Sequence, residues 1–316
     1  MNRIFSRILL LSVACLVSAG CLANDDSRFR KRSKEATLRI LDDNIWEYNL
    51  DTIPSAWQKT GVDCRDDARA PEFARLVRKY SSDIITLQEY SSHMHERLYP
   101  SLQKQGYRIC TEGSGENWNY TPVFYKPSVF ELVECDYFLF TPEKFSNRGT
   151  KSYTSAVFRT KKTGKVFAVI STHLWWKSDK VLPGSTEART RQARCIVSAA
   201  EEIREKYGCP VFVCGDMNCE EATPPIEEFF GAGFVPCYKV ACVYADLTNG
   251  HHVCSPKEGF STESHRKGPS RAEGAIDHCL VRDPGKSRVL VFDCIKSAFT
   301  VPITDHYPNL IDVALQ

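Results

Sequence analysis

The sequence lacks a marked excess of charge of either sign. Its 41 lysine and arginine residues nearly balance 39 aspartate and glutamate residues, and the formal net charge is +2. This balance argues against a broad basic surface of the kind that coats nucleic acid, although a local basic patch stays open. The contents of 25% charged and 42% hydrophobic residues are ordinary for a globular protein. They exclude a disordered, collagen-like or coiled-coil chain.

A hydrophobic run long enough to cross a bilayer comfortably is also missing. The apolar stretch at residues 8–17 is short, follows Arg3 and Arg7, and precedes the small residues 18–20. That layout is typical of a secretory signal peptide, so we expect export, to the periplasm or outside the cell. Cleavage after Ala23 would define a signal peptide at residues 1–23.

Lipid attachment at Cys21 is the alternative, with a lipoprotein signal at residues 1–20. The Ser-Ala-Gly-Cys sequence there resembles a bacterial lipobox, although that motif usually has leucine where Ser18 stands. Residues 24–35 are polar and strongly charged and predict a flexible tether. The remaining domain, residues 36–316, holds 34 basic and 36 acidic residues, a formal charge of −2.

No Cys-x-x-Cys pair occurs among the 14 cysteines, and their spacing does not match common zinc sites. Twelve cysteines lie beyond the N-terminal segment, and in an exported protein this even number predicts several disulfides of open connectivity. Cys214, Cys279 and Cys294 lie inside apolar runs, which instead favours buried core thiols.

No internal repeat or shift in composition marks a domain boundary after residue 36. Apolar runs alternate with amphipathic segments, which predicts one α/β domain. One expected strand ends at Asn44 and another ends at Val313. The other expected strands span residues 83–87, 122–125, 130–140, 153–160, 166–171, 211–214, 275–281 and 288–299. The expected helices span residues 69–80, 94–105, 186–206 and 224–230, and residues 237–271 are expected to be a loop.

Polar residues recur where these strands end. They are Asn44, Glu89, His173, the pair Asp216 and Asn218, and the pair Asp305 and His306. Any one of them is an ordinary loop residue, but five occurrences favour a common cleft, because a rigid sheet can present its strand ends together. Gly215, directly before Asp216, predicts a close approach of two backbones or an unusual turn.

Six short motifs follow one another in a family order. They are Asn44-Ile45-Trp46, Gln88-Glu89, Ser171-Thr172-His173-Leu174, Gly215-Asp216-Met217-Asn218, Ile276-Asp277-His278 and Thr304-Asp305-His306-Tyr307-Pro308. Together they resemble the endonuclease/exonuclease/phosphatase superfamily, over residues 37–313. The resemblance implies the deoxyribonuclease I-like fold, a four-layer α/β sandwich of two mixed β-sheets flanked by helices.

The resemblance also implies a metal-dependent phosphoester hydrolase that uses Mg²⁺, with Mn²⁺ as a substitute. It makes Glu89 the principal metal carboxylate, with Asn44 and Asp305 nearby. The implied catalytic roles fall to five residues: His173 and Asn218 donate to phosphate oxygens, Asp216 orients or deprotonates the water, and Asp277 holds His306. Thr304 stands where the family commonly has serine and keeps the hydroxyl group. Water would attack in line, with either Asp216 or the His306–Asp277 pair as the base.

Substrate choice lies in loops that the fold does not fix. Trp175 and Trp176 follow the catalytic-type His173 and could stack on a base or ribose, meet a lipid headgroup, or pack in the core. Arg189 could bind phosphate, although a solvated helix face is the simpler account.

We expect a monomer that acts on a phosphoester in nucleic acid or nucleotides. The alternatives are a lipid-directed phosphatase or sphingomyelinase-like phospholipase C, and a catalytically silent binding protein on the same scaffold.

Overall fold

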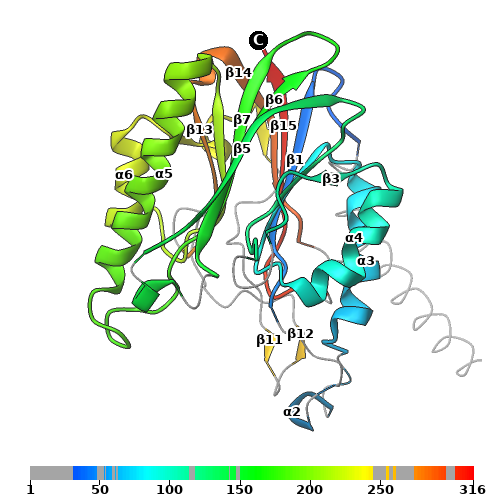
Figure 1. Cartoon of the computed structure of the whole chain (residues 1–316), viewed down its shortest axis with the longest axis vertical. Coiled ribbons are helices and arrows are strands. Elements are labelled where there is room, and N and C mark those ends of the chain that lie inside the picture. The colour runs from blue at the N-terminus through cyan, green and yellow to red at the C-terminus, as the bar shows by residue number, and fades with distance from the viewer. Residues whose placement is uncertain are drawn as a thin grey trace, which may run out of the picture.

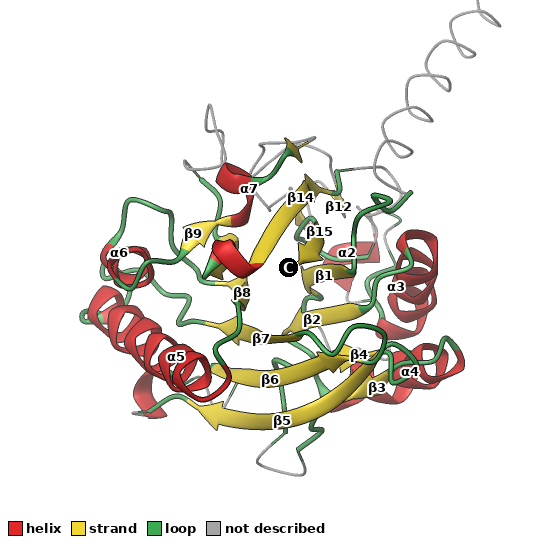
Figure 2. Ribbon diagram, turned by 90° about the horizontal axis from the view of Figure 1, so that it is seen from above, coloured by secondary structure: helices red, strands yellow, loops and turns green. Residues whose placement is uncertain are grey.

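The computed structural model describes residues 31–47, 53, 55–58, 61, 63–113, 118–141, 143–146, 150–244, 254–255, 259–260, 274–296 and 303–316. Within these ranges two mixed β-sheets pack face to face and helices cover both outer faces (Figure 1, Figure 2). The predicted four-layer α/β sandwich is therefore confirmed. The predicted signal peptide, the lipid anchor at Cys21 and residues 24–30 of the tether lie outside the described residues.

Among the described residues, the larger sheet has seven strands in the order β10-β14-β15-β1-β2-β4-β3. They are β1 (Leu38–Asn44), β2 (Ile84–Gln88), β3 (Arg108–Ile109), β4 (Val123–Tyr125), β10 (Val243–Tyr244), β14 (Ser287–Cys294) and β15 (Asn309–Leu315). In the same ranges the smaller sheet has six strands in the order β5-β6-β7-β8-β13-β9. They are β5 (Phe130–Leu139), β6 (Ser152–Thr160), β7 (Val166–His173), β8 (Val211–Asp216), β9 (Val235–Pro236) and β13 (Asp277–Arg282).

Helices α3 and α4 cover the larger sheet, and α5 and α6 cover the smaller one (Figure 2). The helices are α2 (Ser55–Gln58), α3 (Asp66–Tyr80), α4 (Ser92–Lys104), α5 (Ser185–Tyr207), α6 (Pro224–Gly231) and α7 (Cys237–Val240), with 3-10 turns η2 (Glu143–Phe145) and η3 (Pro284–Lys286). The prediction of a plain loop at 237–271 is wrong in its described parts, which contain α7, β10 and the paired short strands β11 (Cys254–Ser255) and β12 (Gly259–Phe260). No helix in the described part of the chain is both long and apolar enough to span a membrane.

Two residues of the predicted tether contact the sandwich. The guanidinium of Arg32 pairs with the carboxylate of Asp83, and the amide of Ser33 donates to Asp312 Oδ2 at 2.9 Å. Asp312 in turn forms a fully buried ion pair with Arg39 on β1. These contacts hold Arg32 and Ser33 against residues of the larger sheet and of the turn before β2.

The expectation of several disulfides is not supported. No disulfide is seen among the eleven cysteines whose side chains are described, and seven of them are buried. Cys214 and Cys279 face each other as register partners on β8 and β13, inside the apolar layer between the sheets. Most of these side chains pack in the apolar layers, as small buried thiols commonly do. The buried thiols predicted at Cys214, Cys279 and Cys294 are confirmed.

The inner strands of the two sheets bring distant segments together. β1 contacts β8, and β2 contacts both β7 and β8, across a core that includes Leu38, Ile84, Phe167 and Phe212. β1 runs parallel to β2, and β7 runs parallel to β8. The carboxyl ends of all four strands therefore meet at one end of the sandwich.

Candidate active site

Strand ends form the floor of a cavity of about 320 Å³ at this end of the sandwich. The residues that line it are Glu47, Glu89, Thr150, Lys151, His173, Trp176, Asp216, Asn218, Ile276 and His306. Five of these were predicted catalytic or metal-binding residues, and Trp176 was a predicted substrate-binding residue. Segments more than two hundred residues apart in sequence thus share one cavity.

Asn44 links the two sheets at this point. Its Nδ2 donates to Asp216 Oδ2 at 3.0 Å and lies 3.3 Å from Glu89 Oε1. Glu89 follows β2 with a positive φ of 58°, which a non-glycine residue seldom adopts. The backbone amide of Glu47 donates to Glu89 Oε2 at 2.7 Å. This strained residue is therefore held with its carboxylate at the cavity.

Gly215 makes the close approach that its place before Asp216 predicted. It has a φ of 145°, and a Cβ atom there would lie only 2.0 Å from the carbonyl oxygen of Thr172 on β7. Only glycine lets β7 and β8 come this close with Asp216 directed into the site. The next turn is held by the amide of Asn218, which donates to Asp216 Oδ1 at 2.9 Å. The side-chain Nδ2 of Asn218 donates to Leu174 O at 3.0 Å.

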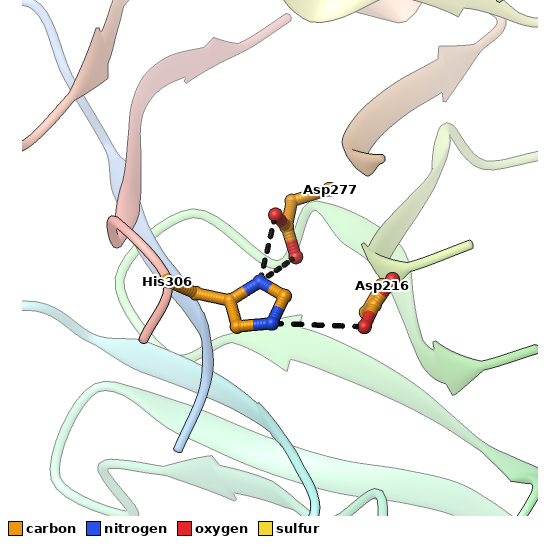
Figure 3. A group of neighbouring side chains, drawn as sticks. All are labelled: Asp216, Asp277 and His306. Atoms are coloured by element: carbon orange, nitrogen blue, oxygen red, sulfur yellow. Dashed lines mark hydrogen bonds and ion pairs between the residues drawn. The ribbon is translucent and has the colours of Figure 1, made fainter. Parts of the chain in front are cut away.

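His306 lies between two acids, as Figure 3 shows. Its Nδ1 lies 2.9 Å from Asp277 Oδ2, and its Nε2 lies 3.9 Å from Asp216 Oδ2 on the other side. Asp277 begins β13 and is the register partner of Asp216 on β8. The hydroxyl of Thr304 donates to the carbonyl oxygen of Asn44 at 2.5 Å and lies 3.3 Å from the amide of His306. The hydroxyl that Thr304 retains thus ties the His306 segment to the end of β1.

Burial and neighbouring charges give the two central groups different proton affinities. Burial first, and then the negative charge of Asp277, raise the pKa of Asp216 to about 7. Burial alone would lower the pKa of His306, but Asp277, Asp305 and Asp216 surround it and raise this pKa well above its usual value. The carboxylates around His306 therefore favour the protonated form of its ring.

The oxygen donors near Glu89 fit a hard divalent cation. Asp305 Oδ1 is buried, accepts no hydrogen bond from the described residues and lies 3.8 Å from His306 Nε2. Such an unsatisfied carboxylate oxygen, together with the Glu89 carboxylate and the Asn44 amide, matches what Mg²⁺ prefers. A second group, Asp216, Asp277 and His306, has ligand atoms that all lie within 4.8 Å of one another. From the sequence, these three residues were predicted to be catalytic.

The three predicted substrate-binding residues lie in different surroundings, and one of them lines the cavity. Trp176 is 53% exposed and lines the cavity. Trp175 is buried, packs edge-on against Phe145 and donates its ring N–H to Ser185 Oγ at 3.0 Å. Arg189 on α5 is only 7% exposed and donates to the carbonyl oxygens of Trp175 and Lys177. Trp175 and Arg189 do not line the cavity and instead support the loop that carries Trp176.

Lys151 and Arg69 were not predicted as site residues. Lys151 lines the cavity beside His173. Arg69 on α3 donates to the carbonyl oxygens of Ile45 and Trp46, just after Asn44, and to that of Ile303, just before Thr304. Both act through contacts between segments far apart in sequence, and a lysine before a strand or an arginine in a helix gives no local signal of such contacts.

The chain matches the model of a known protein family. The model of the endonuclease/exonuclease/phosphatase family matches residues 48–306, which is most of the chain. The chain belongs to this family. Members of the endonuclease/exonuclease/phosphatase family hydrolyse phosphoesters and depend in general on divalent metal ions.

Individual family relatives are distant. Rat nocturnin is 24% identical over 217 residues, a match that covers 65% of this chain and 45% of nocturnin, so the chain spans less than half of that relative. An endonuclease/exonuclease/phosphatase protein from Bacteroides vulgatus has a TM-score of 0.66 at 21% identity, covering 88% of this chain and 99% of its own. A mannosyl-6-phosphatase from Bacteroides thetaiotaomicron has a TM-score of 0.65 at 19% identity, with coverages of 87% and 99%. These structural similarities show the shared fold.

Proposed function

We propose that this chain is an exported, Mg²⁺-dependent hydrolase that cleaves phosphoesters of nucleotides or nucleic acid by in-line attack of water. The observation that supports it best is the convergence of Glu89, His173, Asp216 and His306 from both sheets on one cavity. Mn²⁺ is expected to substitute for Mg²⁺. A bound divalent ion would neutralise charge that develops on the phosphoryl oxygens and the leaving group.

Asp216 is the better candidate for the base that receives the proton of the attacking water. With its pKa near 7, a substantial fraction of Asp216 is ionised at neutral pH and can accept a proton. His306 already carries its proton, because its acidic neighbours raise its pKa well above the usual value. Its role is then to donate a hydrogen bond to a phosphoryl oxygen, while Asp277 fixes the ring through Nδ1.

The preference for a nucleotide or nucleic acid rests on Trp176. Its half-exposed ring at the cavity has Lys177 Nζ 5.1 Å from the ring centroid. An exposed aromatic ring beside a phosphate site can stack on a base, and such stacking is worth about 1–3 kcal/mol per base. The family relationship to nocturnin and the fold shared with a mannosyl-6-phosphatase support phosphoester hydrolysis in general.

Export is proposed from the N-terminal sequence, with cleavage after Ala23 as the leading route. Mass spectrometry of the mature protein from its native host tests this. A mature chain that begins at residue 24 agrees with cleavage, and a diacylglyceryl group on Cys21 would indicate the lipoprotein route. A chain that retains residues 1–20 would contradict both routes.

A substrate panel tests the proposed activity. The panel contains single-stranded and duplex nucleic acids, mononucleotides, inositol phosphates and sphingomyelin, each assayed with Mg²⁺ and with a chelator. We expect phosphate or nucleotide release from the nucleic-acid or nucleotide substrates with Mg²⁺ and none with the chelator. Hydrolysis of inositol phosphates or sphingomyelin alone would instead establish the lipid-directed alternative. No hydrolysis of any substrate would favour the silent binding protein.

A further inference from the structure

Lys151 holds a fixed place in the cavity wall. It directly precedes β6, whose first residue, Ser152, is the register partner of His173 on β7. Its backbone amide donates to Ser146 O at 3.0 Å, and its carbonyl oxygen accepts the amide of Phe140 at 3.0 Å. Both backbone groups are therefore satisfied by the main chain, and the side chain lines the cavity.

The ammonium group of Lys151 is buried against the imidazole ring of His173. The residue is 3% exposed, and its Nζ lies 2.6 Å from Nε2 and 3.0 Å from Nδ1 of His173. Among the described residues, no carboxylate oxygen forms an ion pair with this Nζ. Glu89, Asp216 and Glu47 act on it only as more distant charges.

A buried ammonium needs an anion or several acceptors to offset the loss of water. An ammonium only donates, so the contact with His173 makes the imidazole the acceptor and favours its neutral form. Among the described residues no anion contacts the ammonium group of Lys151, which lies at a cavity that opens to solvent.

We propose that Lys151 is a substrate-binding residue whose ammonium group binds a non-bridging oxygen of the phosphoryl group, and that it adapts the cavity to a terminal phosphate. This inference rests on the proposed function for the identity of the substrate. A terminal phosphate has three non-bridging oxygens and carries up to two negative charges, whereas an internal phosphodiester has two such oxygens and one charge.

The donors on the cavity wall match the terminal group. His306 offers a ring N–H, Asn218 a side-chain amide and Lys151 an ammonium group, and all three residues line the cavity. Lys151 and His306 come from opposite sheets: Lys151 precedes β6, and His306 precedes β15. The ammonium group of Lys151 attracts a dianion more strongly than a monoanion in the same place, because the interaction energy grows with the charge of the phosphate.

Two measurements on the full chain test this assignment in the Lys151→Met variant, which keeps the length of the side chain and removes its charge. The first is the affinity for inorganic phosphate in the presence of Mg²⁺, by titration calorimetry. We expect it to fall roughly 10- to 100-fold, the usual worth of a hydrogen bond from a charged donor. The second is the ratio of kcat/KM for 4-nitrophenyl phosphate to that for methyl 4-nitrophenyl phosphate, which share a leaving group. This ratio should fall about tenfold or more.

Lys162→Met is the matched control. Lys162 lies exposed in the turn that joins β6 and β7, at the other end of the same hairpin, and its loss should change neither quantity. Lys151→Arg keeps the charge and should retain most of the phosphate affinity. If Lys151→Met lowers the thermal midpoint too far for titration, Lys151→Gln replaces it.

Unchanged phosphate affinity in a folded Lys151→Met variant would overturn the proposal, as would an equal loss of kcat/KM for both esters. A wild-type chain that hydrolyses neither these esters nor any substrate of the panel, but binds phosphate through Lys151, would refute the proposed function and leave the phosphate site standing. If the wild-type chain hydrolyses phosphoesters but the Lys151→Met variant binds phosphate as tightly as wild type, the proposed function stands and the role of Lys151 is refuted.

Discussion

Replacing Asp216 with asparagine is expected to lower kcat by about 10²- to 10⁴-fold, the usual contribution of a general base. The amide keeps the size of the side chain and an oxygen that can accept from the amide of Asn218, but it cannot take a proton at neutral pH. Steady-state kinetics with Mg²⁺, on whichever panel substrate the wild-type chain hydrolyses, measures the effect. The fold should survive, because the variant removes a buried negative charge close to that of Asp277.

The pH profile of the same variant gives a sharper readout. Burial and Asp277 raise the pKa of Asp216 to about 7, so a proton occupies this carboxylate below that pH. The wild-type rate should therefore fall as the pH decreases through about 7, and the residual rate of Asp216→Asn should lack this limb. Asp136→Asn, at an exposed carboxylate on β5, is the control and should behave as wild type. An Asp216→Asn variant with a rate within threefold of wild type would mean that another group is the base.

Gly215→Ala is expected to abolish activity and to destabilise the domain. The added Cβ would lie 2.0 Å from the carbonyl oxygen of Thr172, at a φ of 145° that L-residues rarely adopt. Since that oxygen belongs to the backbone of β7, β7 and β8 must separate where His173 and Asp216 lie. We expect a loss of about 3 kcal/mol or more in the free energy of unfolding. Displacement of the strand ends by even 1 Å should cost about a hundredfold in rate.

Thermal denaturation and kinetics of the Gly215→Ala variant test this expectation. Gly231→Ala at the end of α6 is the matched control, because a Cβ there meets no atom within 4 Å. In a helix alanine is more favourable than glycine by about 1 kcal/mol, so the control should be as stable as wild type or slightly more stable. A Gly215→Ala variant that keeps both its thermal midpoint and its rate would contradict the strand spacing described above.

The strand ends of the site could be predicted because their signals are local. Apolar runs that end in a polar residue define β1, β2, β7 and β8, and parallel pairing then places these ends at one edge of each sheet. The role of Gly215 was also predictable, because a glycine directly before a strand-end carboxylate indicates a close approach of two backbones or an unusual turn. Each of these inferences needed only a few consecutive residues.

Long-range contacts account for the predictions that failed. Arg189 has the spacing of a solvated helix residue, but the loop after β7 folds back over α5 and supplies carbonyl oxygens to its guanidinium. Lys151 gains its place from backbone bonds to Ser146 and Phe140. The expected disulfides are not seen among the described cysteines, most of which lie in apolar layers, because an even number of cysteines does not reveal whether they pair.

Calorimetric titration of the full chain with Mg²⁺ is the simplest test of the metal centre on which the proposed chemistry depends. Glu89 presents its carboxylate to the cavity, and Mg²⁺ binds through one or two such groups. We expect the wild-type chain to bind Mg²⁺ and Glu89→Gln to bind it at least about tenfold more weakly, with the same thermal midpoint without metal. Equal Mg²⁺ affinity in the two proteins, or no binding by wild type, would contradict a metal-dependent hydrolase centred on Glu89.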